Sequence, residues 1–258
     1  VLGVFADRAD SRPADLDWKA IEARGFEPKV GQVQIVEGAS RAGFTVRDTG
    51  CGIKPENLAR FKDCGVHMLD SADDILPAAL NFLGIDPNST KPADLEKAAE
   101  LAARVRPSVR KFHSSEYLNA LASGEICLVV GWSGDIKQAR NRAAEANAGV
   151  EIGYAIPKEG AQMFFDNLAI PADANNVEEA HALIDYLYRP EVAARSSSFL
   201  GYASGNLAAQ KHVDAKVIGD KTVYPDEATL RRLFVITARD PATQRAINRL
   251  WTRVKTGR

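Results

Sequence analysis

The sequence predicts an α/β protein, and three observations support that fold class. Strand-like and helix-like stretches alternate from about residue 54 onward, and the helical stretches have recognisable start and stop residues. Of the 258 residues, 45% are hydrophobic and 26% are charged, which is typical of globular proteins. A length near 250 residues allows one large domain or two smaller lobes, each with its own core.

Charge and hydropathy exclude two classes of function. The 33 Lys and Arg residues nearly balance the 34 Asp and Glu residues, so the chain lacks the strongly basic character of a nucleic-acid-binding protein. The sequence contains no run of about eighteen apolar residues, so no segment is expected to span a membrane. The chain begins at Val1 without Met and without the pattern of a secretion signal, which predicts a processed start or a fragment.

The first fifty residues differ in pattern from the rest of the chain. Short apolar runs, such as residues 33–36, are separated by Gly and Arg. One helix is expected at residues 16–23. No stronger periodicity is found in this region.

Two helices are predicted in the next part of the chain. The first covers residues 93–105 and ends before Pro107; its apolar face consists of Leu95, Ala98, Ala102 and Val105. The second is short, with Ser114 or Ser115 as its expected cap and Gly124 as its end. Its apolar face consists of Tyr117, Leu118 and Leu121.

A buried strand is predicted over residues 126–130, because this continuous apolar run is followed by Gly131. A polar turn over residues 132–135 then leads into a helix from 136 to about 146. The turn therefore lies where the carboxyl end of a strand meets the amino end of a helix. In open α/β sheets, ligands bind at that edge.

Two further strands are predicted over residues 151–156 and 164–170, joined by a turn at 157–160. Asn176, with Glu179 three residues later, is expected to cap the next helix.

The helix expected after Asn176 should point four apolar residues toward the protein interior and end at Pro190. These residues are Ala180, Leu183, Ile184 and Leu187. Residues 228–254 predict two more amphipathic helices, divided near Asp240 and Pro241. No internal repeat or low-complexity segment is found.

The sequence lacks the motifs of common catalytic and phosphate-binding sites, including G-x-S-x-G, the phosphate loop, H-E-x-x-H and G-x-G-x-x-G. Cys51 and Cys127 have no local motif that supports a nucleophile, so structural roles are preferred. The cysteines lack the close pairing of a metal site, and the histidines occur singly at positions 67, 113, 181 and 212. The chain is therefore not expected to be an enzyme or to hold a metal or cofactor.

Aromatic and acidic residues recur instead in the loops beside strand ends. Trp132 and Asp135 share one turn, Phe164 and Asp166 begin a predicted strand, and Tyr202 lies in a Gly-rich loop. These residue types suit a flexible organic cation, because carboxylates pair with its ammonium groups while aromatic rings cover its methylenes. The alternative is structural: Trp132 and Phe165 would be core residues, and Asp135 would be a helix cap.

A series of short motifs carries a family resemblance. They are Lys54-Pro55-Glu56-Asn57-Leu58, Asp63-Cys64-Gly65-Val66, Asn88-Ser89-Thr90, Phe112-His113-Ser114-Ser115, Ile126-Cys127, Gly131-Trp132-Ser133-Gly134-Asp135, Ile156-Pro157-Lys158-Glu159-Gly160 and Phe164-Phe165-Asp166. In this order and spacing the chain resembles the spermidine/putrescine-binding periplasmic proteins, the receptors of ABC-type polyamine importers. The resemblance extends from about residue 54 to 258, ending in Trp251-Thr252-Arg253-Val254-Lys255.

The resemblance implies a set of ligand-binding residues. Trp132 would stack on the polyamine chain, and Asp135 and Asp166 would hold its ammonium groups. The remaining implied pocket residues are Phe164, Tyr202, Ser114 and Asp74. At position 74 the putrescine-binding members carry Glu, so the shorter Asp would reach an amine through water.

The resemblance also implies a disulfide between Cys64 and Cys127, consistent with an oxidising periplasm, and leaves Cys51 as a spare thiol. It implies a monomer that passes its ligand to an ABC permease in the inner membrane. No cofactor and no nucleic acid would be involved.

Family members have the type II periplasmic-binding fold, with two lobes that close over the ligand. Here residues 1–53 would be an atypical segment and 54–150 the second lobe. Residues 151–195 would form a first-lobe portion with its crossover, and 196–258 would return to the second lobe. The family's first hundred or so residues are not recognisable, so the first lobe would be truncated or replaced. A folded remnant without high-affinity binding is therefore an alternative.

A second resemblance concerns residues 44–53, which are similar to the D-x-G-x-G box of histidine-kinase-type ATPases. In that case Asp48 would contact adenine, and Gly50 and Gly52 would let the backbone approach the nucleotide. The alternative is a plain glycine turn after a strand.

Overall fold

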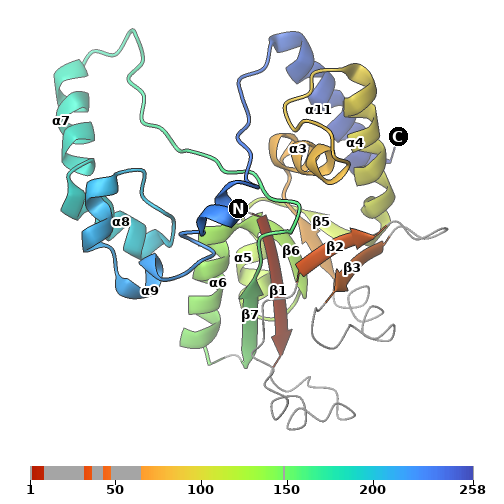
Figure 1. Ribbon diagram of the computed structural model, residues 1–258, viewed down its shortest axis with the longest axis horizontal. Helices are drawn as coiled ribbons and strands as arrows, with labels where there is room; N and C mark the ends of the chain where they lie inside the picture. The colour runs from red at the N-terminus through yellow and green to blue at the C-terminus, as the bar shows by residue number, and fades with distance from the viewer. Residues whose placement is uncertain (1, 9–31, 37–42, 48–64, 148, 258) are drawn as a thin grey trace.

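The computed structural model describes residues 2–8, 32–36, 43–47, 65–147 and 149–257, with side chains from residue 65 onward. The main body contains a five-stranded sheet in the order β5-β4-β6-β1-β7 (Figure 1). Its strands are β1 (Leu2–Arg8), β4 (Val66–Met68), β5 (Val109–Phe112), β6 (Leu128–Trp132) and β7 (Val150–Tyr154). A separate two-stranded sheet pairs β2 (Gln32–Val36) with β3 (Gly43–Arg47).

Strand direction determines where the connecting loops meet. β4 pairs in parallel with both β5 and β6. β1 is antiparallel to both β6 and β7, so β6 and β7 also run in the same direction as each other. The carboxyl ends of β4, β5, β6 and β7 therefore lie at one edge of the sheet.

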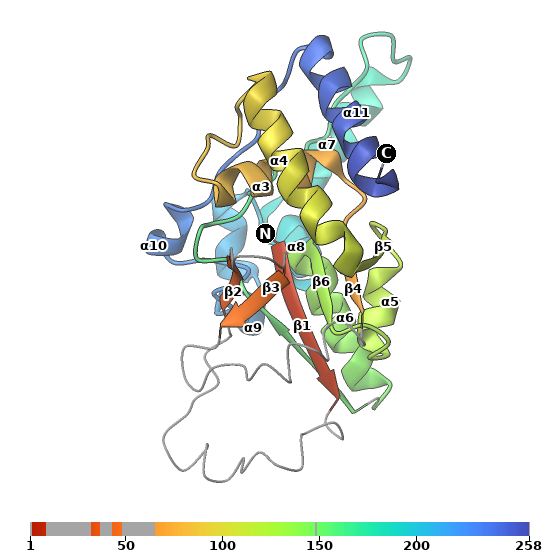
Figure 2. The ribbon, with the colours of Figure 1, turned by 90° about the vertical axis from the view of Figure 1, so that its right-hand side faces the viewer.

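Helices complete the main body. α3 (Ala72–Phe82), α4 (Pro92–Val105) and α11 (Pro241–Thr256) pack against one another beyond one end of the sheet (Figure 2). α5 (Tyr117–Ala122) and α6 (Ser133–Glu145) pack side by side against the strands. The largest hydrophobic cluster joins these elements and includes the fully buried Leu69, Leu76, Val129 and Ile136.

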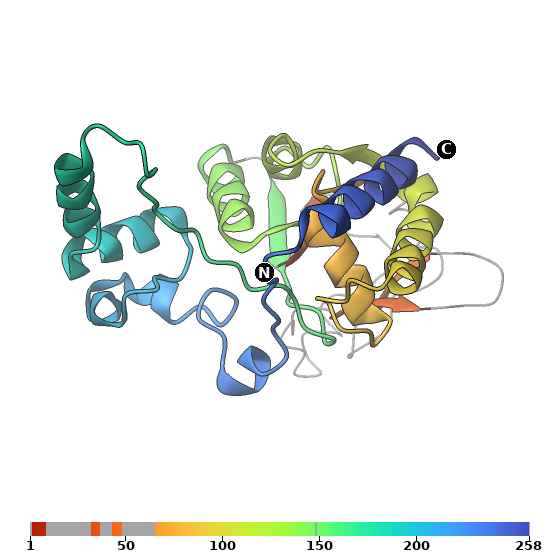
Figure 3. The same cartoon turned by 90° about the horizontal axis from the view of Figure 1, so that it is seen from above.

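A small helical body lies apart from the sheet (Figures 1 and 3). It contains α7 (Val177–Leu187), α8 (Pro190–Leu200), the 3-10 helix η3 (Leu207–His212) and α9 (Ala215–Ile218). Its own hydrophobic cluster consists of Ala194, Ala209, Val213, Val217 and Val223, on both sides of the division expected at residue 195. The domain boundaries remain a prediction.

Two chain segments connect the bodies, and they touch where they leave the main body. Gln162 and Phe234 form a parallel bridge, and the Met163 N–H donates to the Phe234 carbonyl at 2.8 Å. The predicted turn at 157–160 lies just before this crossing and is confirmed by the Gly160 N–H bond to the Pro157 carbonyl. Gly160 has φ +100°, and a Cβ there would lie 1.8 Å from the Arg232 carbonyl oxygen, so glycine is required.

Several local predictions are confirmed. α4 matches the helix predicted over 93–105, and its expected apolar face is buried. The division before α11 falls at Asp240, whose carboxylate accepts the Ala242 and Thr243 N–H groups. The first of the two helices predicted within residues 228–254 corresponds to α10 (Glu227–Leu230), which has only four residues. Gly124 adopts a positive φ just beyond α5, as expected of a helix end.

Two predicted elements differ. Residues 164–170 were expected to form a strand but do not, and Phe165 and Asp166 are exposed. The bridge between Gln162 and Phe234 lies before this stretch, and no described strand pairs with residues 164–170 themselves, so their backbone groups are left to water. The expected polar turn over 132–135 is also absent, because β6 ends at Trp132 and α6 begins at Ser133.

The predicted helix caps are wrong at two positions. Neither Ser114 nor Ser115 caps α5; His113 Nδ1 accepts the Ser115 and Glu116 N–H groups instead, both at 3.0 Å. The ring nitrogen thus takes the acceptor position that a hydroxyl was expected to fill. Asn176 precedes α7 without a side-chain cap bond, and its φ and ψ of −115° and 57° are unlike those of a typical cap.

Some predictions lie outside the described residues: the helix at 16–23, Cys51, Cys64 and the motif containing Asp48, Gly50 and Gly52. Cys127 is in a disulfide. Its pairing with Cys64 remains a prediction. In the part of the chain that the structure describes, no helix is both long and apolar enough to cross a bilayer.

Candidate ligand-binding site

The predicted site residues follow the carboxyl ends of neighbouring parallel strands. Asp74 lies in the first turn of α3, after β4, and Ser114 follows β5. Trp132 is the last residue of β6, and Asp135 lies in the first turn of α6. The strand order therefore brings these four residues to one edge of the sheet, where α/β proteins bind ligands.

Two tyrosine hydroxyls hold the Asp135 carboxylate. Tyr117 Oη donates to Asp135 Oδ2 at 2.6 Å, and Tyr202 Oη donates to Asp135 Oδ1 at 3.3 Å. A carboxylate offers about four acceptor positions, so about two remain for a ligand. The alternative role of Asp135 as a helix cap is wrong, because α6 has no side-chain cap bond.

Burial raises the pKa of both tyrosines, and so does the adjacent Asp135 charge. The hydroxyls of Tyr117 and Tyr202 therefore keep their protons at neutral pH and act as donors. Asp166 adds to this effect, because its charge also raises the pKa of Tyr202. Asp166 is thus electrostatically coupled to the same cluster, although its own side chain is exposed.

Tyr202 reaches this cluster from the small body. It follows Gly201, which ends α8 with φ +78°, and Ser197 Oγ donates to the Tyr202 carbonyl at 2.5 Å. The Tyr202 ring lies against Gly134 in the first turn of α6, where a Cβ would come within 2.1 Å of the ring. Any larger residue at position 134 would displace the ring, so Gly134 permits the two bodies to meet.

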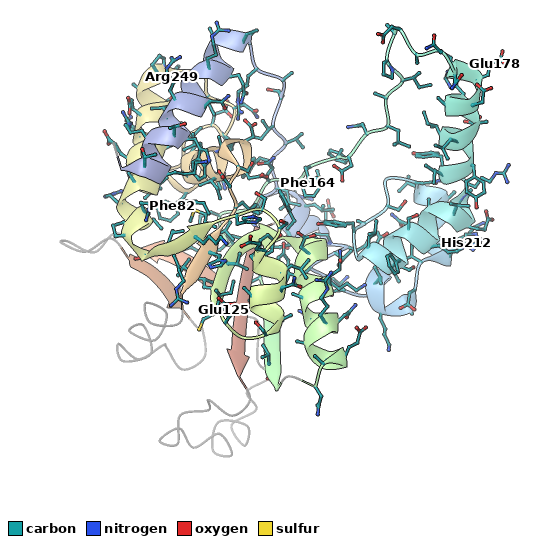
Figure 4. The ribbon with its side chains drawn as sticks, turned by 180° about the vertical axis from the view of Figure 1, so that it is seen from behind. Phe82, Glu125, Phe164, Glu178, His212 and Arg249 are labelled. Atoms are coloured by element: carbon teal, nitrogen blue, oxygen red, sulfur yellow. The ribbon has the colours of Figure 1, made fainter. Side chains whose placement is uncertain are left out.

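Two further aromatic residues, Phe164 and Trp132, contact the tyrosines that hold the carboxylate. Phe164 and Tyr202 make an edge-to-face contact with ring centroids 6.0 Å apart. Figure 4 places Phe164 at the junction between the main body and the segment leading to α7. Trp132 is half-buried beside the main core, and its backbone N–H donates to Tyr117 Oη at 3.4 Å. Phe165, proposed as a core residue in the structural alternative, is 59% exposed.

The remaining predicted residues are less closely connected. Asp74 is 9% exposed, and its side chain makes no hydrogen bond or ion pair with another described residue. Ser114 is half-buried at the end of β5. No described contact joins Asp74 or Ser114 to Asp135. The described residues also contain no group of three or more potential metal ligands.

Sequence reasoning missed the roles of Tyr117 and Gly134. Tyr117 was predicted only as part of an apolar helix face, although a hydroxyl on a buried ring needs a polar partner. Gly134 was one residue of a motif, without a stated role. Glycine in the first turn of a helix is the only signal that could have indicated close approach by another segment.

Comparison with known proteins identifies relatives. Residues 48–223 match the family described as bacterial extracellular solute-binding protein. The chain is 46% identical over 207 residues to the putrescine-binding periplasmic protein PotF of Escherichia coli (strain K12). That match covers 80% of this chain but only 56% of the relative, so the chain spans little more than half of its length.

Solved structures share the fold. The Tp0655 (TpPotD) lipoprotein of Treponema pallidum aligns with a TM-score of 0.63 and 26% identity, over 76% of this chain and 59% of that one. The spermidine/putrescine ABC transporter substrate-binding protein PotD from Streptococcus pneumoniae aligns with a TM-score of 0.67, over 99% of this chain and 66% of that one. Its identity of 22% supports the fold alone. The predicted α/β fold of the periplasmic-binding type is thereby confirmed.

Proposed function

This chain belongs to the bacterial extracellular solute-binding proteins, and from that membership we propose that it binds a linear di- or polyamine of the putrescine and spermidine class. The observation that carries the proposal is the Asp135 carboxylate, which Tyr117 and Tyr202 hold in the first turn of α6, just after Trp132 at the end of β6. The 46% identity to a relative named as putrescine-binding supports the same ligand class.

A linear polyamine carries ammonium groups at its two ends and methylenes between them. An ammonium group loses hydration on binding and needs carboxylate acceptors in return, which Asp135 and Asp166 supply. The methylenes between the ammonium groups need apolar cover. The rings of Trp132, Phe164 and Tyr202 provide that cover and also attract the cation through their faces.

Asp74 and Ser114 extend the proposed pocket along the sheet edge. Asp74 offers a carboxylate that no other described side chain contacts. An ammonium group of the ligand, bridged by water, would satisfy it. Ser114 would add a hydroxyl that can donate or accept.

We propose that the chain acts in the periplasm as the receptor part of an ABC importer and passes its ligand unchanged to the permease. The word periplasmic in the name of the E. coli relative supports this location, and the description of the matching family as solute-binding supports the role. Capture and release require no bond to be made or broken, so the proposal includes no enzymatic step. The alternative of nucleotide binding through Asp48 concerns residues outside those that the structure describes.

Calorimetric titration of the chain with putrescine and spermidine tests this proposal, with ADP as the contrasting ligand. Saturable polyamine binding is expected, and Trp132→Ala should weaken it about tenfold or more because the ring supplies both cation attraction and apolar cover. Tyr188→Ala, at a 62% exposed ring, is the matched control and should bind like the wild type. Binding of ADP without binding of either polyamine would refute the proposed ligand class. Equal polyamine affinity in Trp132→Ala and the wild type would refute the role of Trp132.

A further inference from the structure

Tyr117 is a completely buried tyrosine of α5 whose hydroxyl contacts the candidate site. The hydroxyl donates to Asp135 Oδ2 at 2.6 Å. It also accepts the backbone N–H of Trp132 at 3.4 Å. One phenol therefore contacts both the carboxylate of the site and the backbone of the residue that carries the indole.

These two contacts determine where the Tyr117 hydroxyl points its proton. A backbone N–H can only donate, so the hydroxyl oxygen is the acceptor toward Trp132. The hydroxyl has a single proton, which is left for Asp135 Oδ2. Burial raises the pKa of Tyr117, and so does the Asp135 charge, so the phenol keeps this proton at neutral pH. Tyr117 is therefore a permanent donor to the carboxylate.

The ring that carries this hydroxyl is held firmly in place. A Cβ on Gly131 would lie 2.9 Å from Tyr117 Cε2 and 3.1 Å from its Cζ, so the ring lies directly against the backbone of β6. The ring also belongs to the main hydrophobic cluster, together with Ile136 of α6. A further contact joins α5 to α6, because Arg142 Nη1 donates to Asn119 Oδ1 at 2.5 Å. The hydroxyl is thus carried by a packed ring and not by a flexible side chain.

Tyr117 and Tyr202 reach Asp135 from different parts of the molecule. Tyr117 and Asp135 both belong to the main body, whereas Tyr202 follows α8 of the small body. The two hydroxyls use different oxygens of the carboxylate, Tyr117 at 2.6 Å from Oδ2 and Tyr202 at 3.3 Å from Oδ1. Hydroxyl bonds to a carboxylate are usually about 2.5–2.7 Å long, so the bond from Tyr117 is the stronger one. The orientation of Asp135 is therefore set within the main body, and Oδ1 is the less engaged oxygen.

Tyr154 shows that a buried tyrosine need not make such a bond. Its ring is only 2% exposed, and its hydroxyl makes no hydrogen bond with another described residue. Tyr117 and Tyr154 thus share deep burial and differ in the partners of their hydroxyls. A comparison of their Phe variants separates the bond to Asp135 from the mere loss of a buried hydroxyl.

We infer that Tyr117 is a positioning residue, whose hydroxyl holds the Asp135 carboxylate in the orientation that receives an ammonium group of the ligand. This inference rests on the proposed function. Tyr117 acts through Asp135 and need not touch the ligand. Without the hydroxyl, Asp135 loses its nearer donor and gains rotational freedom, and that freedom must be lost again when an ammonium group binds.

Tyr117→Phe tests this role, because it keeps the ring and removes only the hydroxyl. Calorimetric titration with putrescine should show an affinity about tenfold weaker than that of the wild type. Tyr154→Phe makes the same chemical change at a buried ring and is the matched control, with an expected change of less than about twofold. Thermal unfolding without ligand checks that both variants are folded at the temperature of the titration.

A second control addresses the packing of α5 on α6. Asn119→Ala removes the hydrogen bond to Arg142, which joins the same two helices at an exposed position without contacting Asp135. It should bind putrescine like the wild type. An equal loss of affinity in Asn119→Ala and Tyr117→Phe would overturn the inference, because helix packing and not the hydroxyl would then control the site.

A double-mutant cycle separates positioning of Asp135 from a general structural effect. Asp135→Ala removes both carboxylate oxygens, so the Tyr117 hydroxyl has no carboxylate left to hold. If Tyr117 acts through Asp135, adding Tyr117→Phe to Asp135→Ala should change affinity by less than about twofold, whereas independent effects would multiply. Wild-type affinity in Tyr117→Phe, or full additivity in the cycle, would overturn this inference and leave the proposed function standing. Absence of polyamine binding by the wild-type chain would refute the proposed function, and this inference with it.

Discussion

Asp135→Asn should weaken putrescine binding about 100-fold while leaving the fold intact. Asn has nearly the same size as Asp; its amide oxygen can accept from one of the two tyrosines, and its NH2 group can donate to the hydroxyl oxygen of the other. The negative charge is lost, and the ligand's ammonium group then remains desolvated without its counter-charge. Breaking such a pair costs about 2–5 kcal/mol, and 100-fold corresponds to about 2.7 kcal/mol.

Titration calorimetry at neutral pH measures this loss, and thermal unfolding checks the fold. The matched control is Asp185→Asn, which removes one carboxylate from an exposed position on α7. It should change affinity by less than about twofold, because exposed charges at a distance are screened. Unchanged affinity in Asp135→Asn would place the binding site elsewhere on the molecule.

Trp251→Ala should destabilise the main body by about 3–5 kcal/mol, as is usual when a buried Trp is truncated. Trp251 is 5% exposed, and its indole Nε1 donates to Asp70 Oδ1 at 2.8 Å. Its ring packs edge-to-face on Phe112, with centroids 5.3 Å apart. Lys255 Nζ also donates to Asp70, at 2.7 Å, so one carboxylate joins two residues of α11 to the chain just before α3.

Urea unfolding of the wild type and three variants measures this effect. Trp251→Phe keeps a ring but loses the N–H, so it should cost less than Trp251→Ala. Arg249→Ala changes an exposed residue of the same helix (Figure 4) and should stay within about 0.5 kcal/mol of the wild type. Equal stability of Trp251→Ala and Arg249→Ala would show that the Trp251 indole does not anchor α11.

Features that depend on neighbouring residues could be predicted from the sequence alone. The apolar spacing of residues 95–105 predicted α4 and its buried face, and Asp240 before Pro241 predicted the start of α11. The strand followed by a helix around Trp132 and Asp135 predicted the edge of the sheet at which the candidate site lies. In each case the hydrogen bonds and the periodicity involve positions only a few residues apart.

Which distant residues meet could be seen only in the folded chain. The pairing of Asp135 with Tyr117 joins positions 18 apart, and its pairing with Tyr202 joins positions 67 apart. The same limit explains two wrong predictions. Residues 164–170 had strand-like composition but no described strand beside them, and α7 had an inward-facing pattern but no buried residue. Composition and periodicity determine what a segment can pair with, whereas the pairing itself depends on which surfaces the folded chain brings within a few ångströms.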